Sequence, residues 1–495
     1  MSLTEKASLT TRSTTVRDKS RPTRPDAALL LILTVAFMVV LDFSIVNVAL
    51  ASIERELHVG ATSVQWVITA YAIAFGGLLV LGGRIGDLFG RRKMFVTGLI
   101  VFSLASLVGG FADDIELLVA ARALQGMGAA LVAPAALSLI TTSIPEGNAR
   151  TRALGYYGAT ASVGFVAGLV LGGLLVQFFD WRAVLWVNVP IGLAAAALAP
   201  RLLPLSRPER SRQRLDIGGA LLVTGGVVAL VYALSQGPVR GWLSVQFGTA
   251  LALSLLLIAA FVLVEQRHPS PLVRLDILRL KSLRTANLVT AMIGASSASE
   301  LLVIPLYMQL VLHYPPLVTG LAMAPQGVFG FFGASRGSSL IRRIGLARLL
   351  VLTEASAALG LALLGVFLVT RSYPLLLIGF AFTGFGTSAG AFASTVAATV
   401  GIANREQGFA SGLVNMSRQV GAAVGVAVAA AIVGVGASSG ESLPADRGAM
   451  LASAGAAGIA ILIALGGVGA SSKEGARLID MVRRFGDGSR SESAA

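Results

Sequence analysis

Gly83-Arg-Ile-Gly-Asp-Leu-Phe-Gly-Arg-Arg-Lys93 is a short charged segment between two long apolar runs, at 64–83 and 94–112. It holds four bases, one acid and three glycines. Each flanking run has the roughly 20 residues that an α-helix needs to cross a bilayer. The glycines permit a tight turn and close helix contact. The sequence therefore predicts a loop at 83–93 between two membrane-spanning helices.

Apolar runs of spanning length continue on both sides of this loop. Counting them gives fourteen, and an even number puts both chain ends on one side of the membrane. The predicted spans are 27–50, 64–83, 94–112, 115–141, 153–178, 182–200, 217–236, 243–264, 286–311, 317–340, 347–369, 374–400, 407–435 and 448–470.

The composition supports a polytopic membrane protein and excludes a soluble globular enzyme. Only 13% of the 495 residues are charged, against about 25% in soluble domains. Cysteine is absent, and the three histidines lie far apart in the sequence, so no metal site is expected. The chain also lacks a phosphate-binding loop motif. We therefore predict a protein that is not an enzyme, holds no cofactor and does not itself hydrolyse nucleotides.

The positions of the bases predict the orientation. With both termini in the cytoplasm, 32 of the 39 bases fall in the tails, the inward loops and the helix ends beside them, and five fall in the outward loops or at the adjoining helix ends. This asymmetry is the positive-inside pattern of membrane proteins, and arginine far exceeds lysine, which is typical of a GC-rich bacterial genome. The sequence predicts a multi-pass protein of the bacterial inner membrane that contacts lipids and binds no nucleic acid.

A long-range repeat divides the predicted helices into two halves. Gly164 and Gly168 match Gly421 and Gly425 at an offset of 257. Parallel six-helix repeats are one plan of secondary transporters, with the substrate site at the repeat interface. The predicted organisation is a disordered cytoplasmic tail at 1–26, a six-helix bundle at 27–200, a linker with two inserted helices at 201–285, a second six-helix bundle at 286–470 and a cytoplasmic tail at 471–495.

Four motifs carry a resemblance to a known family, and it covers residues 27–470. The loop 83–93 resembles the signature loop of the major facilitator superfamily. The other motifs resemble phrases of that family and of its fourteen-helix drug:proton antiporter branch: Leu41-Asp42-Phe-Ser-Ile-Val-Asn47-Val-Ala-Leu50, Arg122-Ala-Leu-Gln125-Gly126-Met-Gly128 and Trp181-Arg182 with Asn188-Val-Pro190-Ile-Gly192. The resemblance implies an all-α fold of two six-helix bundles plus two inserted helices, and export of amphipathic compounds in exchange for protons.

One family motif departs from its usual form in the fifth predicted helix. Leu169 stands where drug:proton antiporters usually have proline. The glycines of the motif are kept, and their spacing permits close helix packing; they are Gly164, Gly168, Gly172 and Gly173.

The loop at 83–93 also has a predicted role in conformational change. An acid among several bases can latch two bundles in one state and release them in the other. The alternative is a basic loop that only orients the protein. The residues assigned to the latch are Gly83, Asp87, Gly90, Arg91 and Arg92.

Ionisable residues within membrane helices are costly and are functional candidates by default. At about 1.5 Å per residue, Asp42 and Glu300 lie about 22 and 21 Å from the cytoplasmic ends of their helices, and Arg122 lies about 10 Å below the outer end of its own. Asp42 and Glu300 fall at nearly equivalent places of the repeat. We predict that these three residues couple transport to protons. The alternative for Asp42 and Arg122 is a fixed ion pair, and Glu300 is also suited to attract a cation.

Several other polar residues are candidates for a substrate cavity, although ordinary packing is the alternative for each. They are Asn47, Tyr71, Gln125, Tyr307, Gln309, Asn415, Arg418 and Gln419. Glu354, near the cytoplasmic end of its helix, is expected to face inward water or to pair with Arg348, and the alternative is a role in proton coupling.

The predicted function is a monomeric, proton-coupled exporter of amphipathic or cationic drugs that works by alternating access. One alternative is a transporter of lipids or lipid-linked metabolites on the same fold. A second is a membrane-embedded sensor or scaffold that transports nothing.

Overall fold

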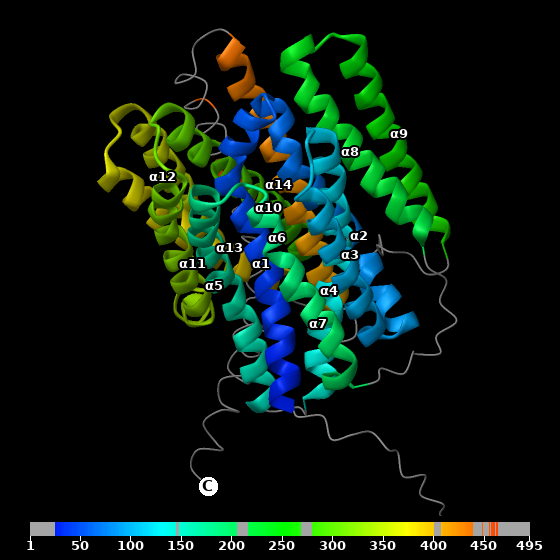
Figure 1. Cartoon of the computed structure of the whole chain (residues 1–495). Helices are drawn as coiled ribbons and strands as arrows, with labels where there is room; N and C mark the ends of the chain where they lie inside the picture. The colour runs from blue at the N-terminus through cyan, green and yellow to red at the C-terminus, as the bar shows by residue number, and fades with distance from the viewer. Residues whose placement is uncertain are drawn as a thin grey trace, which may run out of the picture.

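The computed structural model describes residues 25–144, 148–204, 216–268, 280–399 and 407–438, with 448, 455, 457–460 and 462–463. Across these ranges the chain forms helices joined by short connections, without a β-strand (Figure 1). In the same ranges, twelve helices are long and apolar enough to cross a membrane. The predicted all-α membrane fold is therefore confirmed.

The first half of the chain forms seven helices. Two of them, α6 and α7, follow each other closely and make one apolar span over Ala183–Leu202. The helices are α1 (Pro25–Glu56), α2 (Ala61–Phe89), α3 (Arg91–Gly109), α4 (Ile115–Ser143), α5 (Asn148–Phe178), α6 (Ala183–Trp186) and α7 (Asn188–Leu202).

A helical hairpin and the second half follow. The hairpin packs beside α2 and α14, at one side of the molecule (Figure 1). The hairpin consists of α8 (Ile217–Arg240) and α9 (Val245–Arg267); the second half contains α10 (Lys281–Leu306), the π-helical turn η2 (Tyr307–Val311), α11 (Pro316–Ile344), α12 (Leu346–Thr370), α13 (Tyr373–Thr399) and α14 (Gln407–Ser438).

Thirteen of the fourteen predicted runs coincide with these helices or with the α6–α7 pair. Within α8, the apolar stretch among the described side chains is Leu221–Leu234. Most of the fourteenth run, 448–470, lies outside the residues that the structure describes, as do the C-terminal tail and all but two residues of the N-terminal one. The count of fourteen therefore stays a prediction. Helix α1 begins at Pro25, inside the predicted tail, because proline is well suited to the first helical turn.

The predicted loop at 83–93 is a helical joint instead. Helix α2 continues to Phe89 and α3 starts at Arg91, so Gly90 alone lies between them. Gly90 has a φ of 98°, which L-residues rarely adopt, and this conformation turns the chain. Gly345 makes the same joint between α11 and α12 with a φ of 87°. The prediction that glycine turns the chain here is correct. The charged residues around Gly90, however, belong to the ends of the two helices.

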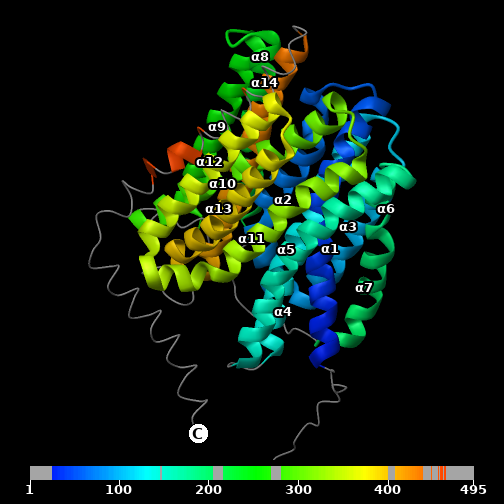
Figure 2. The same cartoon turned by 90° about the vertical axis from the view of Figure 1, so that its left-hand side faces the viewer.

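Glycine contacts show that the two halves pack alike. A Cβ placed on Gly168 of α5 would lie 2.7 Å from the carbonyl oxygen of Leu41 in α1. In the second half, a Cβ on Gly425 of α14 would lie 2.5 Å from Cα of Ala295 in α10, beside the Ala295 carbonyl. The seams α1–α5 and α10–α14 therefore have the same construction. Figure 2 shows where the halves meet, with α11 beside α5.

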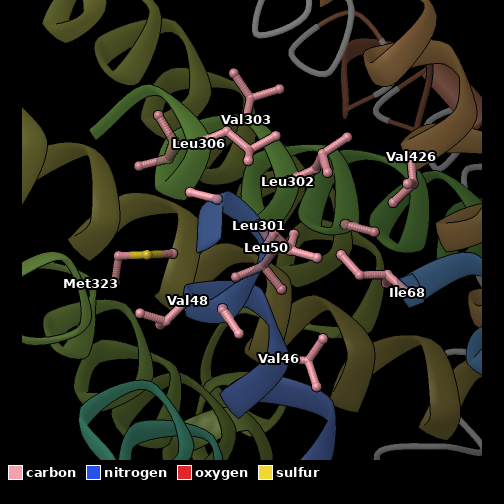
Figure 3. Close-up of a cluster of buried hydrophobic side chains, with 14 of the residues drawn as sticks. Val46, Val48, Leu50, Ile68, Leu301, Leu302, Val303, Leu306, Met323 and Val426 are labelled. Carbon is pink, nitrogen blue, oxygen red and sulfur yellow. The ribbon is translucent and has the colours of Figure 1, made fainter. Parts of the chain in front are cut away.

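A buried apolar cluster joins the halves at the end of the molecule opposite to the start of α1. It brings the last turns of α1 and the start of α2 against the last turns of α10 (Figure 3). Its members include Val46, Val48, Leu50, Ile68, Leu301, Leu302, Val303, Leu306, Met323 and Val426. Near the start of α1, a separate cluster consists only of first-half residues. This cluster seals the halves together at one end, which we call the sealed end. A further cluster groups Leu81 of α2 with second-half residues such as Leu283, Leu349 and Leu413.

Candidate functional site

Asp42 of α1 lies in the interior of the first half, where two helices, α4 and α7, supply its partners. Its Oδ2 is 2.7 Å from NH1 of Arg122 in α4. Its Oδ1 accepts hydrogen bonds from Gln125 at 3.1 Å and from Asn188 of α7 at 2.8 Å. Asp42 is fully buried and Arg122 is 1% exposed. The carboxylate therefore has a cation and two amide donors in place of water, which a buried charge requires.

Arg122 is held from several sides as well. Its Nε donates to the carbonyl of Val67 at 2.9 Å, and NH1 also donates to Oε1 of Gln125 at 2.9 Å. The guanidinium carbon lies 4.5 Å from the ring centroid of Tyr71, a cation–π contact. Asp42, Arg122, Gln125, Asn188 and Tyr71 thus form one unit, which we call the Asp42 cluster.

The sequence named four members of this cluster and missed the fifth. Asn188 stood inside a recognised motif without a role, because nothing in a linear pattern shows that α7 turns its amide toward Asp42. Gln125 and Tyr71, predicted for a substrate cavity, instead support Asp42 and Arg122.

Glu300 of α10 occupies the interior of the second half. Its Oε1 accepts hydrogen bonds from Gln326 of α11 and from Thr383 of α13, both at 3.0 Å. Its Oε2 is buried without a hydrogen-bond partner in the part of the chain that the structure describes, and no ion pair reaches it there. Glu300 thus has polar support from two helices and no cation.

The glycine contacts between helices allow the two sites to be aligned. A Cβ on Gly126 of α4 would lie 2.5 Å from the carbonyl oxygen of Tyr71 in α2. Gly384 of α13 approaches the carbonyl of Gln326 in α11 in the same way. Helix α13 therefore corresponds to α4, and α11 corresponds to α2.

This alignment shows how the sites differ. One turn before the aligned glycine, α4 carries Arg122 and α13 carries Phe380, and both side chains are buried. Immediately before the glycine, Gln125 and Thr383 each bond the acid of their own half. The hydrogen-bonding position is kept, and the cation is replaced by an aromatic ring.

Glu300 does not lie opposite Asp42 in the packing register. Leu41 and Ala295 make equivalent contacts with glycines of α5 and α14, so Ser296 is the counterpart of Asp42. Glu300 follows Ser296 by four residues, which is about 6 Å along a helix. The predicted near-equivalence of the two acids is therefore off by one helical turn toward the sealed end.

The residues assigned to the latch lie at the joint between α2 and α3. NH1 of Arg92 donates to the carbonyls of Pro200 and Leu203, at 3.2 and 3.1 Å, and so holds the start of α3 to the end of α7. Gly83 faces Pro134 of α4, and Arg91 is partly exposed. The side chain of Asp87 lies outside the described residues. Those contacts of Arg92 stay within the first half.

Two cavity candidates lie at the sealed end. Nε2 of Gln309 donates to the carbonyl of Val48 at 2.8 Å, a hydrogen bond between the two halves. The hydroxyl of Tyr307 donates to the carbonyl of Leu368 in α12 at 2.5 Å. Both residues therefore stabilise the sealed end. Asn47 is buried and its amide bonds the carbonyl of Phe43 in its own helix at 2.8 Å.

The remaining cavity candidates lie on α14. Arg418 is exposed, and its NH2 donates to Oδ1 of Asn415 at 2.9 Å. Gln419 is buried against Gly76 of α2. The eight predicted residues therefore divide among the Asp42 cluster, the sealed end and α14 and do not form one site.

The glycines of α5 serve two different contacts. Gly164, Gly168 and Gly172 face α1, whereas a Cβ on Gly173 would lie 2.6 Å from Cα of Leu317 in α11. Leu169, which replaces the usual proline, is buried where its carbonyl approaches Gly320 of α11. Helix α5 therefore contacts α11 of the second half around Leu169 and Gly173, and the helix is continuous there.

A polar cluster at the rim of the first half, where α1 ends, was not predicted. Arg182 pairs with Glu56 at the end of α1, lies 3.3 Å from Asp113, and stacks on Trp181. The indole of Trp181 donates to Glu56 at 2.9 Å. Trp181 and Arg182 were noted only as parts of a motif. They join the end of α1 to the α3–α4 connection.

Comparisons with known proteins agree with this architecture. The family model of the Major Facilitator Superfamily matches residues 32–426. A puromycin resistance protein from Streptomyces alboniger is 42% identical over 408 residues, which is 81% of this chain and 80% of that protein. A cephamycin export protein from Amycolatopsis lactamdurans is 39% identical, with 85% and 87% of the two chains covered.

Solved structures of low sequence identity share the fold. A peptide transporter in complex with sulfate has a TM-score of 0.68 at 14% identity and covers 89% of this chain and 94% of its own. A bacterial homologue of the lysosomal transporter Spinster, in an inward-facing and unoccupied conformation, has a TM-score of 0.62 at 14% identity, with 89% and 96% covered.

Proposed function

Because the chain belongs to the major facilitator superfamily, a family of membrane transporters rather than enzymes, we propose that it exports antibiotics or other amphipathic compounds in exchange for protons. The proposal rests on the activities for which the relatives of this chain are named. Proteins 42%, 39% and 34% identical to it are named for puromycin resistance, cephamycin export and lincomycin resistance. These drugs differ in structure, so we assign a substrate class and no single compound.

The sealed end supports an alternating-access mechanism with a defined starting state. The positive-inside pattern of the bases supports an orientation with the start of α1 in the cytoplasm of a bacterium. In that orientation the sealed end faces outward, and the proposed starting state is open to the cytoplasm. Export then requires that the apolar cluster between α1 and α10 separate. The hydrogen bond from Gln309 to Val48 breaks in the same step.

Proton exchange at the two buried acids supplies the driving force in this proposal. Protonation of Asp42 removes the negative charge that neutralises Arg122, so the cluster must rearrange or lose its ion pair. Glu300, without a cation, gains or loses a proton at lower structural cost. Both acids lie on helices that meet at the sealed end, which links proton binding to its opening.

Transport by reconstituted protein tests the function directly. The full chain in proteoliposomes is expected to accumulate labelled puromycin when the lumen is acidic, and a protonophore should abolish the gradient-driven uptake. Asp42→Asn is expected to abolish it while the protein still folds and inserts. Uphill uptake by Asp42→Asn would refute the assignment of Asp42.

The same vesicles separate the alternatives. Movement of a fluorescent phospholipid with no flux of puromycin or ethidium would support a lipid transporter. The absence of any gradient-driven flux would support a sensor or scaffold and refute the proposed function.

A further inference from the structure

Glu354 on α12 is a buried acid that the proposed function does not use. Its side chain is 0% exposed. Neither carboxyl oxygen has a hydrogen-bond partner within the described parts of the chain. The expectation that Glu354 faces inward water or pairs with Arg348 is wrong, because Glu354 is enclosed by helices and Arg348 is exposed without an ion pair to it.

The neighbouring helix makes room for this carboxyl. A Cβ placed on Gly390 of α13 would lie 2.7 Å from Oε1 of Glu354 and 3.2 Å from Cδ1 of Ile293 in α10. Any larger residue at 390 would displace the acid. Glu354 therefore lies where α12, α13 and α10 meet.

The first half contains an equivalent place without an acid, which an alignment of the helices identifies. A Cβ on Gly128 of α4 would contact the backbone of Gly98 and Phe102 in α3, and a Cβ on Gly386 would contact that of Thr353 and Ala357 in α12. These equivalent contacts align α3 with α12.

In that alignment two aliphatic residues correspond to the acid and its glycine. Leu99 takes the place of Glu354, and Val132 takes the place of Gly390. Leu99 and Val132 are both buried in the apolar core of the first half. A carboxyl and the space for it thus occur together in the second half alone.

The residues that surround Glu354 and Glu300 come from the same face of α10 and the same face of α13. On α10, Glu300 follows Ile293 by seven residues, which returns to the same face after two turns. On α13, Thr383, which bonds Glu300, precedes Gly390 by seven residues. The two acids are therefore spaced by about 10 Å along one interhelical seam.

Unpartnered hydroxyls continue the seam beyond Glu354, away from the sealed end. Thr290 precedes Ile293 by three residues on α10, and Ser394 follows Gly390 by four on α13. Both hydroxyls are buried and have no hydrogen-bond partner in the described ranges. Polar atoms left unsatisfied in a buried place call for a specific explanation.

Among the residues that the structure describes, the charged groups of the surrounding helices do not reach Glu354. Helix α13 carries no Asp, Glu, Lys or Arg, and apart from Glu300 the charged residues of the other neighbours and of α12 itself are exposed. These are Lys281 and Arg284 on α10, Arg336, Arg342 and Arg343 on α11, Arg348 on α12 and Arg418 on α14. An unpaired carboxylate is costly in such a place, whereas a protonated carboxyl costs much less.

We propose that Glu354 is a further proton-binding site, the second one in the second half, on a path that leads from Glu300 along the α10–α13 seam to the side where α1 begins. This inference rests on the proposed proton coupling. A proton leaves the carboxyl of Glu300, crosses the intervening distance through hydrogen-bonded water molecules and binds the carboxylate of Glu354, so Glu300 becomes ionised and Glu354 neutral. The total charge of the pair stays constant during this step. Thr290 and Ser394 then offer hydroxyls for the next transfer.

Infrared titration of the purified full-length protein tests the site without requiring transport. The carbonyl stretch of protonated carboxyls is recorded over a pH series for the wild type, Glu354→Gln and Glu300→Gln. We expect each substitution to remove a different titrating band. A spectrum unchanged by Glu354→Gln, or a Glu354 band that persists at every pH, would overturn the proposal.

A matched double variant separates a proton site from a packing residue. Glu354→Leu with Gly390→Val copies the Leu99 and Val132 pair of the first half, so it is expected to fold. Acid-driven puromycin uptake should be lost in this variant, whereas downhill puromycin flux should remain. Undiminished uphill uptake would overturn the path. If the wild type shows no proton-driven uptake while the Glu354 band titrates, the proposed function fails and the proton site stands.

Discussion

The two halves of this transporter use the same helix framework around acids of different character. In the first half, Asp42 is paired with Arg122 and receives two amide hydrogen bonds. In the second half, Glu300 has two hydrogen bonds, and Phe380 stands where the arginine would be. The comparison teaches that a repeated fold can hold one acid as part of an ion pair and leave the other free to change its charge.

The comparison also explains why the chain has so few charges inside the membrane. A buried ion pair is stable when its remaining hydrogen bonds are satisfied, as they are around Arg122. A buried acid without a cation is favoured in the neutral form. We therefore assign a proton-dependent switch to the first site, where protonation of Asp42 disrupts the ion pair, and proton carriage to the second.

Removal of the cation is expected to have the largest effect. Arg122→Leu leaves Asp42 buried without its charge partner, which costs about 3–5 kcal/mol of unfolding free energy. Denaturation of the purified protein measures this loss. The double variant Asp42→Asn with Arg122→Leu should recover part of it, because no charge then remains unpaired. Equal stability of Arg122→Leu and the wild type would contradict the fixed pair.

Addition of the missing cation is the reciprocal change. Phe380→Arg places a guanidinium one turn from Thr383, on the side toward which Glu300 is displaced. We expect Glu300 to become ion-paired and its titrating infrared band to disappear, with loss of acid-driven puromycin uptake. Phe380→Leu is the control for lost aromatic packing and should keep the band. If Phe380→Arg retained both the band and the uptake, the contrast between the halves would lose its functional meaning.

Much of the framework was predictable from the sequence, since thirteen apolar runs of spanning length coincide with observed helices. The pairing of Asp42 with Arg122 was foreseen as one alternative because their depths agree. The partners Asn188, Gln326 and Thr383 were not foreseen. They are uncharged residues on other helices, and helical periodicity does not reveal which faces meet.

The charged joint between α2 and α3 shows the opposite limit. Its bases and glycines were interpreted as a loop, yet only Gly90 leaves the helical conformation. A single residue with positive φ can turn the chain when the flanking residues stay helical. Similarly, the offset between the two repeats in the sequence did not reveal that Glu300 is displaced by one turn. The displacement follows from the contacts of Leu41 with Gly168 and of Ala295 with Gly425, which only the structure shows.

Neutralising Glu300 is expected to change stability much less than removing Arg122. In Glu300→Gln the side chain keeps an oxygen that can accept from Gln326 and Thr383, and no cation is left unpaired. We expect a change in unfolding free energy of about 1 kcal/mol, the size of one ordinary hydrogen bond. Acid-driven uptake should nevertheless be lost. A stability loss as large as that of Arg122→Leu would show that Glu300 is paired in the folded protein.

The smallest predicted effect concerns the contact that joins the halves at the sealed end. Gln309→Leu removes the hydrogen bond to the Val48 carbonyl, worth about 1 kcal/mol, and leaves the surrounding apolar cluster in place. The sealed state should lose about fivefold in population relative to the opened state, because 1.4 kcal/mol corresponds to about tenfold. The chain contains no cysteine, so two introduced cysteines at Ser52 and Val318 would carry spin labels whose distance distribution reports opening. Tyr307→Phe, which removes a bond within the second half only, is the matched control and should leave that distribution unchanged. If both variants shifted it equally, Gln309 would act through local helix stability and not by joining the halves.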